Sequence, residues 1–272
     1  MTPVEFRKLL LAESLTHPGL VRKTNEDSLG FFLESGCFFV ADGMGGGSAG
    51  DIASSLLENQ ISDAIEFSGG ESPEVRKNKI HTAIHDAHLK IREYAETRSF
   101  AQMGTTLALM LFNPWNPRRA DLCHIGDSRI YRLRNNSLNV LTRDHTVGAE
   151  LEREMMSSDH PEKGIGDHRT SVFSHVLTRV VGATSNEPEA EWSETEVRSR
   201  DRFLICSDGV TTMLAEPEIQ KIISESGRPD EAVRALSESV LKAGAKDNYS
   251  IIIIFVGDLG LPKSDPEETA FY

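Results

Sequence analysis

The sequence predicts an α+β fold, in which helices and antiparallel strands form separate groups. Two segments with helical spacing of apolar residues follow each other at 52–65 and 80–94, whereas strand-like segments follow one another from 105 to 141. The chain lacks the regular alternation of one strand with one helix that predicts a parallel sheet. Its 272 residues, 39% of them hydrophobic, suffice for one domain with a sizeable core.

Two apolar strands at 29–33 and 37–41 begin the predicted order and form a hairpin. The second strand delivers Asp42 at its end. The glycine-rich residues 43–50 then form a turn that opens the first helix, in which apolar residues recur every three or four positions. A second helix follows Pro73, because a proline in the first turn suits a helix start.

From Thr105 the apolar pattern changes from helical to strand-like. Four strands joined by Asn-Pro, Gly-Asp-Ser and Arg-Asn-Asn-Ser turns predict an antiparallel meander at 105–112, 120–125, 130–133 and 138–141. Residues 146–157 have a helical pattern. Residues 158–175 contain proline, glycine and histidine without a period, so we expect a flap segment near 146–175.

The remaining elements complete one domain. We predict strands and helices, in chain order, at 176–181 (strand), 203–206 (strand), 216–226 (helix), 229–243 (helix) and 249–256 (strand). The domain then covers residues 1–257, with its core at about 12–256. Residues 258–272 are rich in Asp, Glu, Pro and Lys and predict an acidic, flexible tail.

Charge and composition exclude several classes of protein. A formal net charge of -13 argues against nucleic acid or an anionic membrane as the main partner, since both require a basic face. The cysteines lie far apart in apolar runs and predict buried, reduced thiols. No apolar stretch resembles a secretory signal, and the longest late apolar run, 251–256, is too short to span a bilayer. We expect a cytoplasmic monomer without membrane insertion.

Acidic residues recur in short signatures along the chain. These signatures are Thr24-Asn25-Glu26-Asp27, Asp42-Gly43, Ser207-Asp208-Gly209 and Asp247-Asn248. Most lie where a predicted strand meets a turn, so their carboxylates are expected to converge at one end of a sheet. Taken singly, each is ordinary turn chemistry. Together, oxygen ligands without a Cys or His cluster favour magnesium or manganese over zinc, and hence phosphate chemistry.

Seven signatures, including these acidic ones, occur in a fixed order: Val21-Arg22-Lys23-Thr24-Asn25-Glu26-Asp27, Val40-Ala41-Asp42-Gly43-Met44-Gly45-Gly46, Gly104-Thr105-Thr106, Gly126-Asp127-Ser128-Arg129, Arg143-Asp144-His145-Thr146, Ser207-Asp208-Gly209 and Lys246-Asp247-Asn248. The set resembles the metal-dependent protein phosphatases (PPM family, type 2C). Its length is similar to that of compact bacterial members that oppose eukaryotic-like Ser/Thr kinases. The resemblance implies a four-layer αββα sandwich, with two central antiparallel sheets flanked by helices.

The resemblance also implies an enzyme that hydrolyses phosphoserine and phosphothreonine in proteins and uses two Mn²⁺ or Mg²⁺ ions per site. Asp42 would bridge both ions and the nucleophilic water. Asp208 and Asp247 would complete the coordination of one ion, and the carbonyl of Gly43 would bind the other. A carboxylate shared between two cations offsets their repulsion. The water, with its pKa lowered by the cations, would attack phosphorus without a phosphoenzyme.

Three further residues gain roles by the same resemblance. Asp27, ahead of Glu26, is similar to a carboxylate that binds metal through water. Asp127 is similar to a ligand of a weaker third metal. Arg22 matches the phosphate-binding arginine, whose planar guanidinium suits two phosphate oxygens. Expected partners are phosphorylated Ser/Thr proteins and a cognate kinase.

The chain departs from the family pattern at two positions. Met44 stands where many eukaryotic members have a histidine proposed to protonate the leaving alcohol, so the leaving-group acid is unassigned. Thr212 stands where many relatives have an aspartate, which weakens the case for a tight third metal. His145 lies within a family signature and is expected to support the site rather than to catalyse.

Other interpretations of the motifs are open to test. Gly45-x-Gly47-x-x-Gly50, with Glu66 about twenty residues on, fits a dinucleotide fingerprint and would indicate an NAD-dependent dehydrogenase, although Glu66 belongs to the helix that the glycines open. The segment around Ser128 resembles a hydrolase nucleophile elbow, but Ile130 replaces its second glycine. A catalytically inactive phosphoprotein-binding module of the same fold is a third possibility, opposed by the complete set of metal carboxylates.

The histidines of the flap segment offer one more candidate site. Their spacing fits no regular metal site, so we interpret them as solvated loop residues: His160, His168 and His175.

Overall fold

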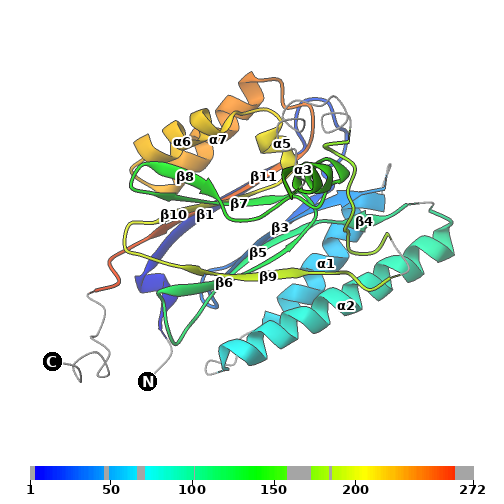
Figure 1. The fold of residues 1–272 in the computed structure, drawn as a ribbon, viewed down its shortest axis with the longest axis horizontal. Helices are drawn as coiled ribbons and strands as arrows, with labels where there is room; N and C mark the ends of the chain where they lie inside the picture. The colour runs from blue at the N-terminus through cyan, green and yellow to red at the C-terminus, as the bar shows by residue number, and fades with distance from the viewer. Residues whose placement is uncertain are drawn as a thin grey trace.

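Two antiparallel sheets stack face to face, and helices cover both outer faces (Figure 1). Helices α1 (Ala49–Ile65) and α2 (Pro73–Arg98) pack on one sheet, and α6 (Glu216–Glu225) and α7 (Pro229–Lys242) pack on the other. The predicted α+β class and the αββα layers are therefore confirmed. The computed structural model describes residues 4–45, 49–65, 71–100, 102–157, 173–183 and 186–260.

The sheet under α6 and α7 joins the first and last strands of the domain. Its strand order is β1 (Leu10–His17), β11 (Tyr249–Val256), β10 (Arg202–Cys206), β7 (Arg129–Arg134) and β8 (Ser137–Val140). Every neighbouring pair is antiparallel. The eight residues of β11 are all buried because it is central and covered on both faces.

The other sheet carries the predicted N-terminal hairpin. Its strand order is β2 (Asp27–Phe32), β3 (Cys37–Met44), β5 (Leu107–Phe112), β6 (Arg119–Ile125) and β9 (Glu191–Glu196), and the short β4 (Gly104–Thr105) pairs with the end of β3. These pairs are also antiparallel. Since no described strands pair in parallel, the dinucleotide-binding interpretation is wrong.

Aromatic side chains from both sheets fill the layer between them. Phe112 of β5 makes edge-on contacts with Phe38 of its own sheet and with Phe203 of the opposite sheet, each with ring centroids 6.1 Å apart. Edge-to-face packing of this kind adds to the free energy gained from burying apolar area. The layer thereby fixes the two sheets relative to each other, and with them the strand ends that carry the acidic signatures.

The helices follow their sequence signals. In α1 the buried residues Ala53, Leu57 and Ile61 recur every four positions and face the sheet. In α2 the side chain of Ser72 caps the helix by accepting a hydrogen bond from the Val75 N–H, with proline at the first helical position. Helix α3 (Val147–Ser157) matches the predicted helical segment.

The predicted meander is wrong. Strands β5 and β6 form a hairpin in one sheet, whereas β7 and β8 form a hairpin in the other. The chain crosses between the sheets at Gly126, whose φ of 101° is accessible to glycine. Both sheets bury an apolar face in the same central layer, so the sequence pattern alone does not reveal the change of sheet.

The boundaries of other strands also differ from expectation. Residues 176–181 form no strand, because Leu177 and Val181 make only isolated bridges. Strands β1 and β9 were not predicted, since their exposed faces are polar and their patterns irregular. Residues 158–172 of the expected flap and 261–272 of the expected tail lie outside the described residues.

Two composition-based predictions can be compared with the structure. The three cysteines are buried and free, and burial raises the pKa of each thiol, as expected for unreactive core residues. Within the described ranges, none of the helices is both long and apolar enough to cross a membrane.

Candidate functional site

The acidic signatures meet at one end of the sandwich, where β3, α3 and the short helix α5 (Asp208–Thr211) lie together (Figure 1). Asp27 begins β2 and lies directly opposite Asp42 of β3 in the ladder. Asp208 opens the one-turn helix α5 (Asp208–Thr211) immediately after β10, and Asp247 precedes β11. Strand β3 continues to Met44, so Asp42 lies within the strand rather than just after it.

The buried carboxylates raise one another's pKa. Burial raises the pKa of Asp42 well above its usual value, and the charges of Asp27, Asp208, Asp127 and Asp247 raise it further. Burial likewise raises the pKa of Asp27 to about 7, with a further contribution from Asp208. Clustered, partly buried negative charge of this kind is stabilised by a bound cation.

Two serines hold one oxygen of Asp27. The Ser207 and Ser250 hydroxyls each donate to Asp27 Oδ2 at 2.8 Å, which ties the start of β2 to β10 and β11. The other oxygen, Oδ1, is buried and has no hydrogen-bond partner among the described residues. A buried carboxylate oxygen without a partner requires an explanation, and a water or cation ligand supplies one.

Threonines from a second signature fix the backbone of Asp42. The Asp42 N–H donates to Thr106 Oγ1 at 3.0 Å, and the Asp42 carbonyl accepts from Thr105 Oγ1 at 3.0 Å and from the Thr106 N–H at 2.9 Å. Thr106 Oγ1 in turn lies 2.7 Å from the buried Ser128 hydroxyl. Ser128 therefore serves the structure, and the nucleophile-elbow interpretation is wrong.

Gly43 allows three chain segments to pack closely around the end of β3. A Cβ added at Gly43 would lie 2.0 Å from the Gly50 carbonyl oxygen and 2.6 Å from that of Glu26. The Gly43 N–H donates to the Glu26 carbonyl. The glycines at 43 and 50 thus serve close packing of strand on helix, which also explains the resemblance to a dinucleotide fingerprint. Gly47 of that fingerprint lies outside the described residues.

Arg22 forms an ion pair with Asp247 at the edge of the acidic cluster. Its Nη2 lies 2.7 Å from Asp247 Oδ2, and this hydrogen bond raises the Arg22 pKa. Asn248 holds the preceding loop in place: its Nδ2 donates to the carbonyls of Pro18 and Thr24, and its Oδ1 accepts from the Glu26 N–H. The Asp-Asn signature therefore supplies both a candidate ligand and the anchor of the Arg22 loop.

A cavity of about 420 Å³ adjoins the cluster. Its lining includes Asp127, Asp208, Thr212 and His175. Burial raises the pKa of Asp127 to about 7, with Asp208 as the next cause, so Asp127 belongs to the same acidic region. Of the three flap histidines, His160 and His168 lie outside the described residues.

His145 holds the turn that carries Asp127. The Gly126 N–H donates to His145 Nδ1 at 3.2 Å, and the His145 N–H donates back to the Gly126 carbonyl at 2.7 Å. Because Nδ1 accepts a hydrogen bond, the ring proton lies on Nε2, which is 3.2 Å from Glu191 Oε2. Burial lowers the His145 pKa, which favours this neutral ring. No motif in the sequence indicates the contact with Glu191.

The donor set fits hard cations. Asp27, Asp42, Asp208 and Asp247 supply oxygens only, and the orphaned Asp27 oxygen faces no other partner. Within the described part of the chain, no three His, Cys, Asp or Glu side chains form a ready-made metal cluster. The arrangement thus offers candidate ligands for magnesium or manganese, held in place by serines, threonines and backbone.

Comparisons with known proteins identify relatives of this chain. The chain is 31% identical over 253 residues to the Listeria welshimeri serine/threonine phosphatase stp, which covers 89% of this chain and 94% of that protein. PppA, a regulatory component of the T6SS in Pseudomonas aeruginosa, matches with a TM-score of 0.77 at 30% identity, covering 91% of this chain and 97% of that one.

A metal-bound relative has the same fold. The catalytic domain of the phosphatase PstP, solved with two manganese ions, matches with a TM-score of 0.73 at 28% identity, covering 92% of this chain and 99% of that one. The family described as protein phosphatase 2C matches residues 21–243. The chain therefore belongs to the protein phosphatase 2C family and, by that membership, is a phosphoprotein phosphatase.

Proposed function

We propose that this chain is a metal-dependent protein serine/threonine phosphatase that hydrolyses phosphoserine and phosphothreonine. The observation that carries the proposal is the set of buried carboxylates around Asp42, which raise one another's pKa, beside an Asp27 oxygen without a partner. Excess buried negative charge favours divalent cations, and cations next to an arginine favour a phosphate substrate.

The proposed metal ligands are those that the family resemblance implies. Asp42 would be shared by two Mn²⁺ or Mg²⁺ ions, with Asp208 and Asp247 on one ion and the Gly43 carbonyl on the other. By the same resemblance Asp27 would act through water, for which its Oδ1 is free because Ser207 and Ser250 bind only Oδ2. Asp127 is the proposed ligand of a weaker third ion. The bound ions supply an activated water and neutralise charge that develops on the phosphate.

Arg22 is the proposed phosphate-binding residue. Its side chain is half-exposed, so an incoming phosphate can reach it. Asp247 holds the guanidinium beside the acidic cluster at 2.7 Å, and Asn248 fixes the loop that carries it. A guanidinium donates to two phosphate oxygens at once, which orients the phosphoryl group and offsets its charge.

The proposed partners are phosphorylated Ser/Thr proteins and a bacterial eukaryotic-like Ser/Thr kinase whose products this enzyme would dephosphorylate in the cytoplasm. The names of the relatives support the substrate class, since stp is a serine/threonine phosphatase. The pairing can be tested by mixing purified kinase, its protein substrate and this chain. Removal by this chain of the phosphate that the kinase has added would support the pairing.

The deciding experiment measures release of phosphate from a phosphothreonine peptide with manganese or magnesium. We predict metal-dependent turnover that EDTA abolishes and that Asp208→Asn lowers by about 100-fold or more, because a metal carboxylate is lost. The matched control is Asp86→Asn, which removes an exposed carboxylate on α2 and should retain full activity.

Two outcomes would contradict the proposal. Normal turnover by Asp208→Asn would show that catalysis does not need the proposed metal ligand Asp208. Calorimetry that detects phosphopeptide binding but no manganese binding would instead identify the chain as an inactive phosphoprotein-binding module.

A further inference from the structure

Arginines gather at the end of the sandwich opposite the acidic cluster. Two lie on β7, two lie in the turn between β9 and β10, and one precedes β6; we call this set the arginine surface: Arg132, Arg134, Arg198, Arg200 and Arg118. Figure 1 places this end away from α3 and α5. Since β10 separates the two ends by five residues, the arginine surface lies roughly 15 to 20 Å from the acidic cluster.

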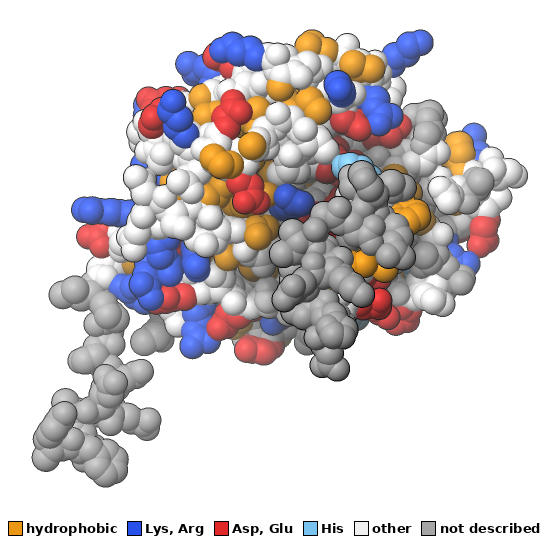
Figure 2. All heavy atoms as spheres, turned by 45° about the horizontal axis from the view of Figure 1, so that its top comes forward, with side chains coloured by type: hydrophobic (Ala, Val, Ile, Leu, Met, Phe, Trp, Pro, Cys, Tyr) orange, Lys and Arg blue, Asp and Glu red, His pale blue; other side chains and the backbone are white. Residues whose placement is uncertain are grey.

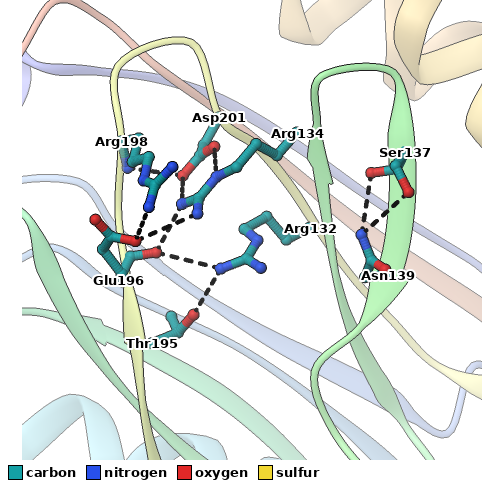
Figure 3. A network of polar contacts seen from close by, with 8 residues as sticks. All are labelled: Arg132, Arg134, Ser137, Asn139, Thr195, Glu196, Arg198 and Asp201. Atoms are coloured by element: carbon teal, nitrogen blue, oxygen red, sulfur yellow. Dashed lines mark hydrogen bonds and ion pairs between the residues drawn. The ribbon is translucent and has the colours of Figure 1, made fainter.

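Only part of this positive charge is compensated. Asp201, 1% exposed, takes both of its ion-pair hydrogen bonds from Arg134, at 2.7 and 2.6 Å. Glu196 pairs with Arg198 at 2.7 Å and, more distantly, with Arg134 (Figure 3). Among the described residues, no other carboxylate forms an ion pair with the arginine surface. This positive excess contrasts with the formal net charge of -13, and Figure 2 shows Lys and Arg side chains (blue) gathered toward the left of the molecule.

Arg132 is the least compensated member. Its Nη1 donates only to neutral oxygens, the Thr195 hydroxyl at 3.2 Å and the Glu196 carbonyl at 3.4 Å. Its Nε–H is buried without a partner in the described structure. Burial and the nearby charge of Arg134 lower the Arg132 pKa. The charges of Asp201 and Glu196 oppose this effect on the Arg132 pKa from a distance, but neither forms an ion pair with Arg132. A partly buried guanidinium without an ion pair is costly, and a carboxylate placed against it would stabilise it.

We propose that the arginine surface binds an acidic segment of a partner protein, rich in Asp and Glu and lying extended across β7 and the β9–β10 turn. Arg198 and Arg200 are exposed and complete the site around Arg132. Guanidinium groups match carboxylates in shape and charge. Because the rest of the chain is acidic, such a segment is attracted to this end and repelled elsewhere.

The same charge balance favours a short peptide over nucleic acid or an anionic membrane. A long polyanion or an extended anionic surface would also meet the acidic remainder of the molecule, whereas a short segment need contact only the arginine surface. Binding there leaves the acidic cluster open. The inference therefore goes beyond the proposed catalytic function and does not depend on it.

Fluorescence anisotropy tests the proposal with a short labelled peptide that alternates Glu and Gly. We expect the full-length chain to bind it, to bind a matched Gln-Gly peptide far more weakly, and to lose affinity as salt rises. Arg132→Gln combined with Arg198→Gln should weaken binding by about tenfold or more. Both substitutions spare the Arg134–Asp201 pair, so the fold should persist.

The matched control removes two positive charges elsewhere, by Lys221→Gln and Arg234→Gln on the exposed faces of α6 and α7. It should bind the Glu peptide as the unaltered chain does, and both double variants should hydrolyse p-nitrophenyl phosphate equally. Equal affinity of the two double variants, or of the two peptides, would overturn the proposal.

Two further arms test the class of partner. Tighter binding of an oligonucleotide or of anionic phospholipid vesicles than of the Glu peptide would overturn the choice of a protein segment. A full-length chain with Asp265→Asn, Glu267→Gln and Glu268→Gln should bind the peptide no differently. Binding seen only in that variant would assign the surface to the chain's own acidic residues and overturn the proposed partner.

Discussion

Asp27 uses its two oxygens for different purposes. Ser207, which follows β10, and Ser250 of β11 fix Oδ2, while Oδ1 is buried without a partner among the described residues. The serines therefore fix the orientation of the carboxylate before any ligand arrives. Such preorganisation reduces the cost of ordering a ligand-binding group. One residue thus couples the packing of three strands to the candidate metal site.

His124 is a second buried polar residue, but unlike Asp27 it has no side chain that hydrogen-bonds to it among the described residues. Its side chain is 3% exposed, neither ring nitrogen has a hydrogen-bond partner among the described residues, and its ring lies 4.6 Å from that of His145. Burial first, and then the neighbouring His145, lower its pKa from 6.5 to about 3. The folded chain therefore keeps this ring neutral where the unfolded chain protonates it.

We predict that His124→Phe reduces acid sensitivity. The pKa of His124 is lower in the folded chain than in the unfolded chain. As pH falls from 6.5 to about 3, the unfolded chain therefore takes up a proton at His124 that the folded chain does not, and the free energy of unfolding decreases. At about pH 5 the loss amounts to roughly 2 kcal/mol in the free energy of unfolding. His124→Phe should remove it, as urea unfolding at about pH 7.5 and pH 5 would measure. The exposed His81→Asn serves as control, and the same pH dependence in His124→Phe would contradict the assignment.

At the scale of elements, the end of β3 is the most constrained point of the site. Asp42 must remain in register with Asp27, and Gly43 must leave space for the start of α1. The hydrogen bonds from Thr105 and Thr106 hold the other side of the strand. A shift of β3 by one residue would turn Asp42 to the opposite face of the sheet.

We predict that Gly43→Ala destabilises the fold by about 2 kcal/mol or more, because the added methyl group would overlap backbone atoms of Gly50 and Glu26 that cannot move independently. Thermal unfolding followed by circular dichroism would measure the change. Gly227→Ala is the matched control, since its Cβ would meet only the end of the Glu231 side chain at 3.3 Å. Equal midpoints for the two variants would show that the backbone around residue 43 adapts.

The same scale shows what the sequence could predict. Strands and helices with strong apolar patterns, such as β11 and α1, are predictable because their buried positions require apolar residues at regular spacing. Strand β9, with Glu, Ser and Thr at most positions, was missed because its pairing with β6 determines its structure. The meander was wrong because a change of sheet at Gly126 leaves no apolar signal.

In the site, motif residues were predictable, but their supports were not. The acidic signatures indicated convergence of Asp42, Asp208 and Asp247, because carboxylates at strand ends have few structural roles when they recur in order. Ser250 gave no signal, since it reaches Asp27 across 223 positions of sequence. Contacts over such separations depend on the stacking of the sheets, which a single sequence does not encode in local patterns.

At the scale of the whole molecule, the fold gathers like charges at one end and holds them there. Residues from β2, β3, α5 and the segment before β11 reach that end only because two sheets stack. Their mutual repulsion opposes folding, while the aromatic layer between the sheets stabilises it. The site therefore lowers the stability of the ligand-free fold and gains stability when a ligand binds, which is a common trade-off between stability and function.

We therefore predict opposite effects of Asp42→Asn with and without metal. In EDTA the variant should melt at a higher temperature than the unaltered chain, because a buried, repelled carboxylate is replaced by a neutral amide. With manganese at about 100 times its Kd, the unaltered chain should gain about 2.7 kcal/mol, a shift of roughly 5 to 10 °C.

Asp42→Asn should lose this manganese shift, and Asp86→Asn on α2 should retain it. Differential scanning calorimetry of the three chains measures both effects without any substrate, so the result bears on metal binding separately from catalysis. A manganese shift in Asp42→Asn equal to that of the unaltered chain would mean that the ions bind elsewhere. A lower melting temperature of Asp42→Asn in EDTA would mean that its carboxylate stabilises the metal-free fold, against the repulsion that raises its pKa.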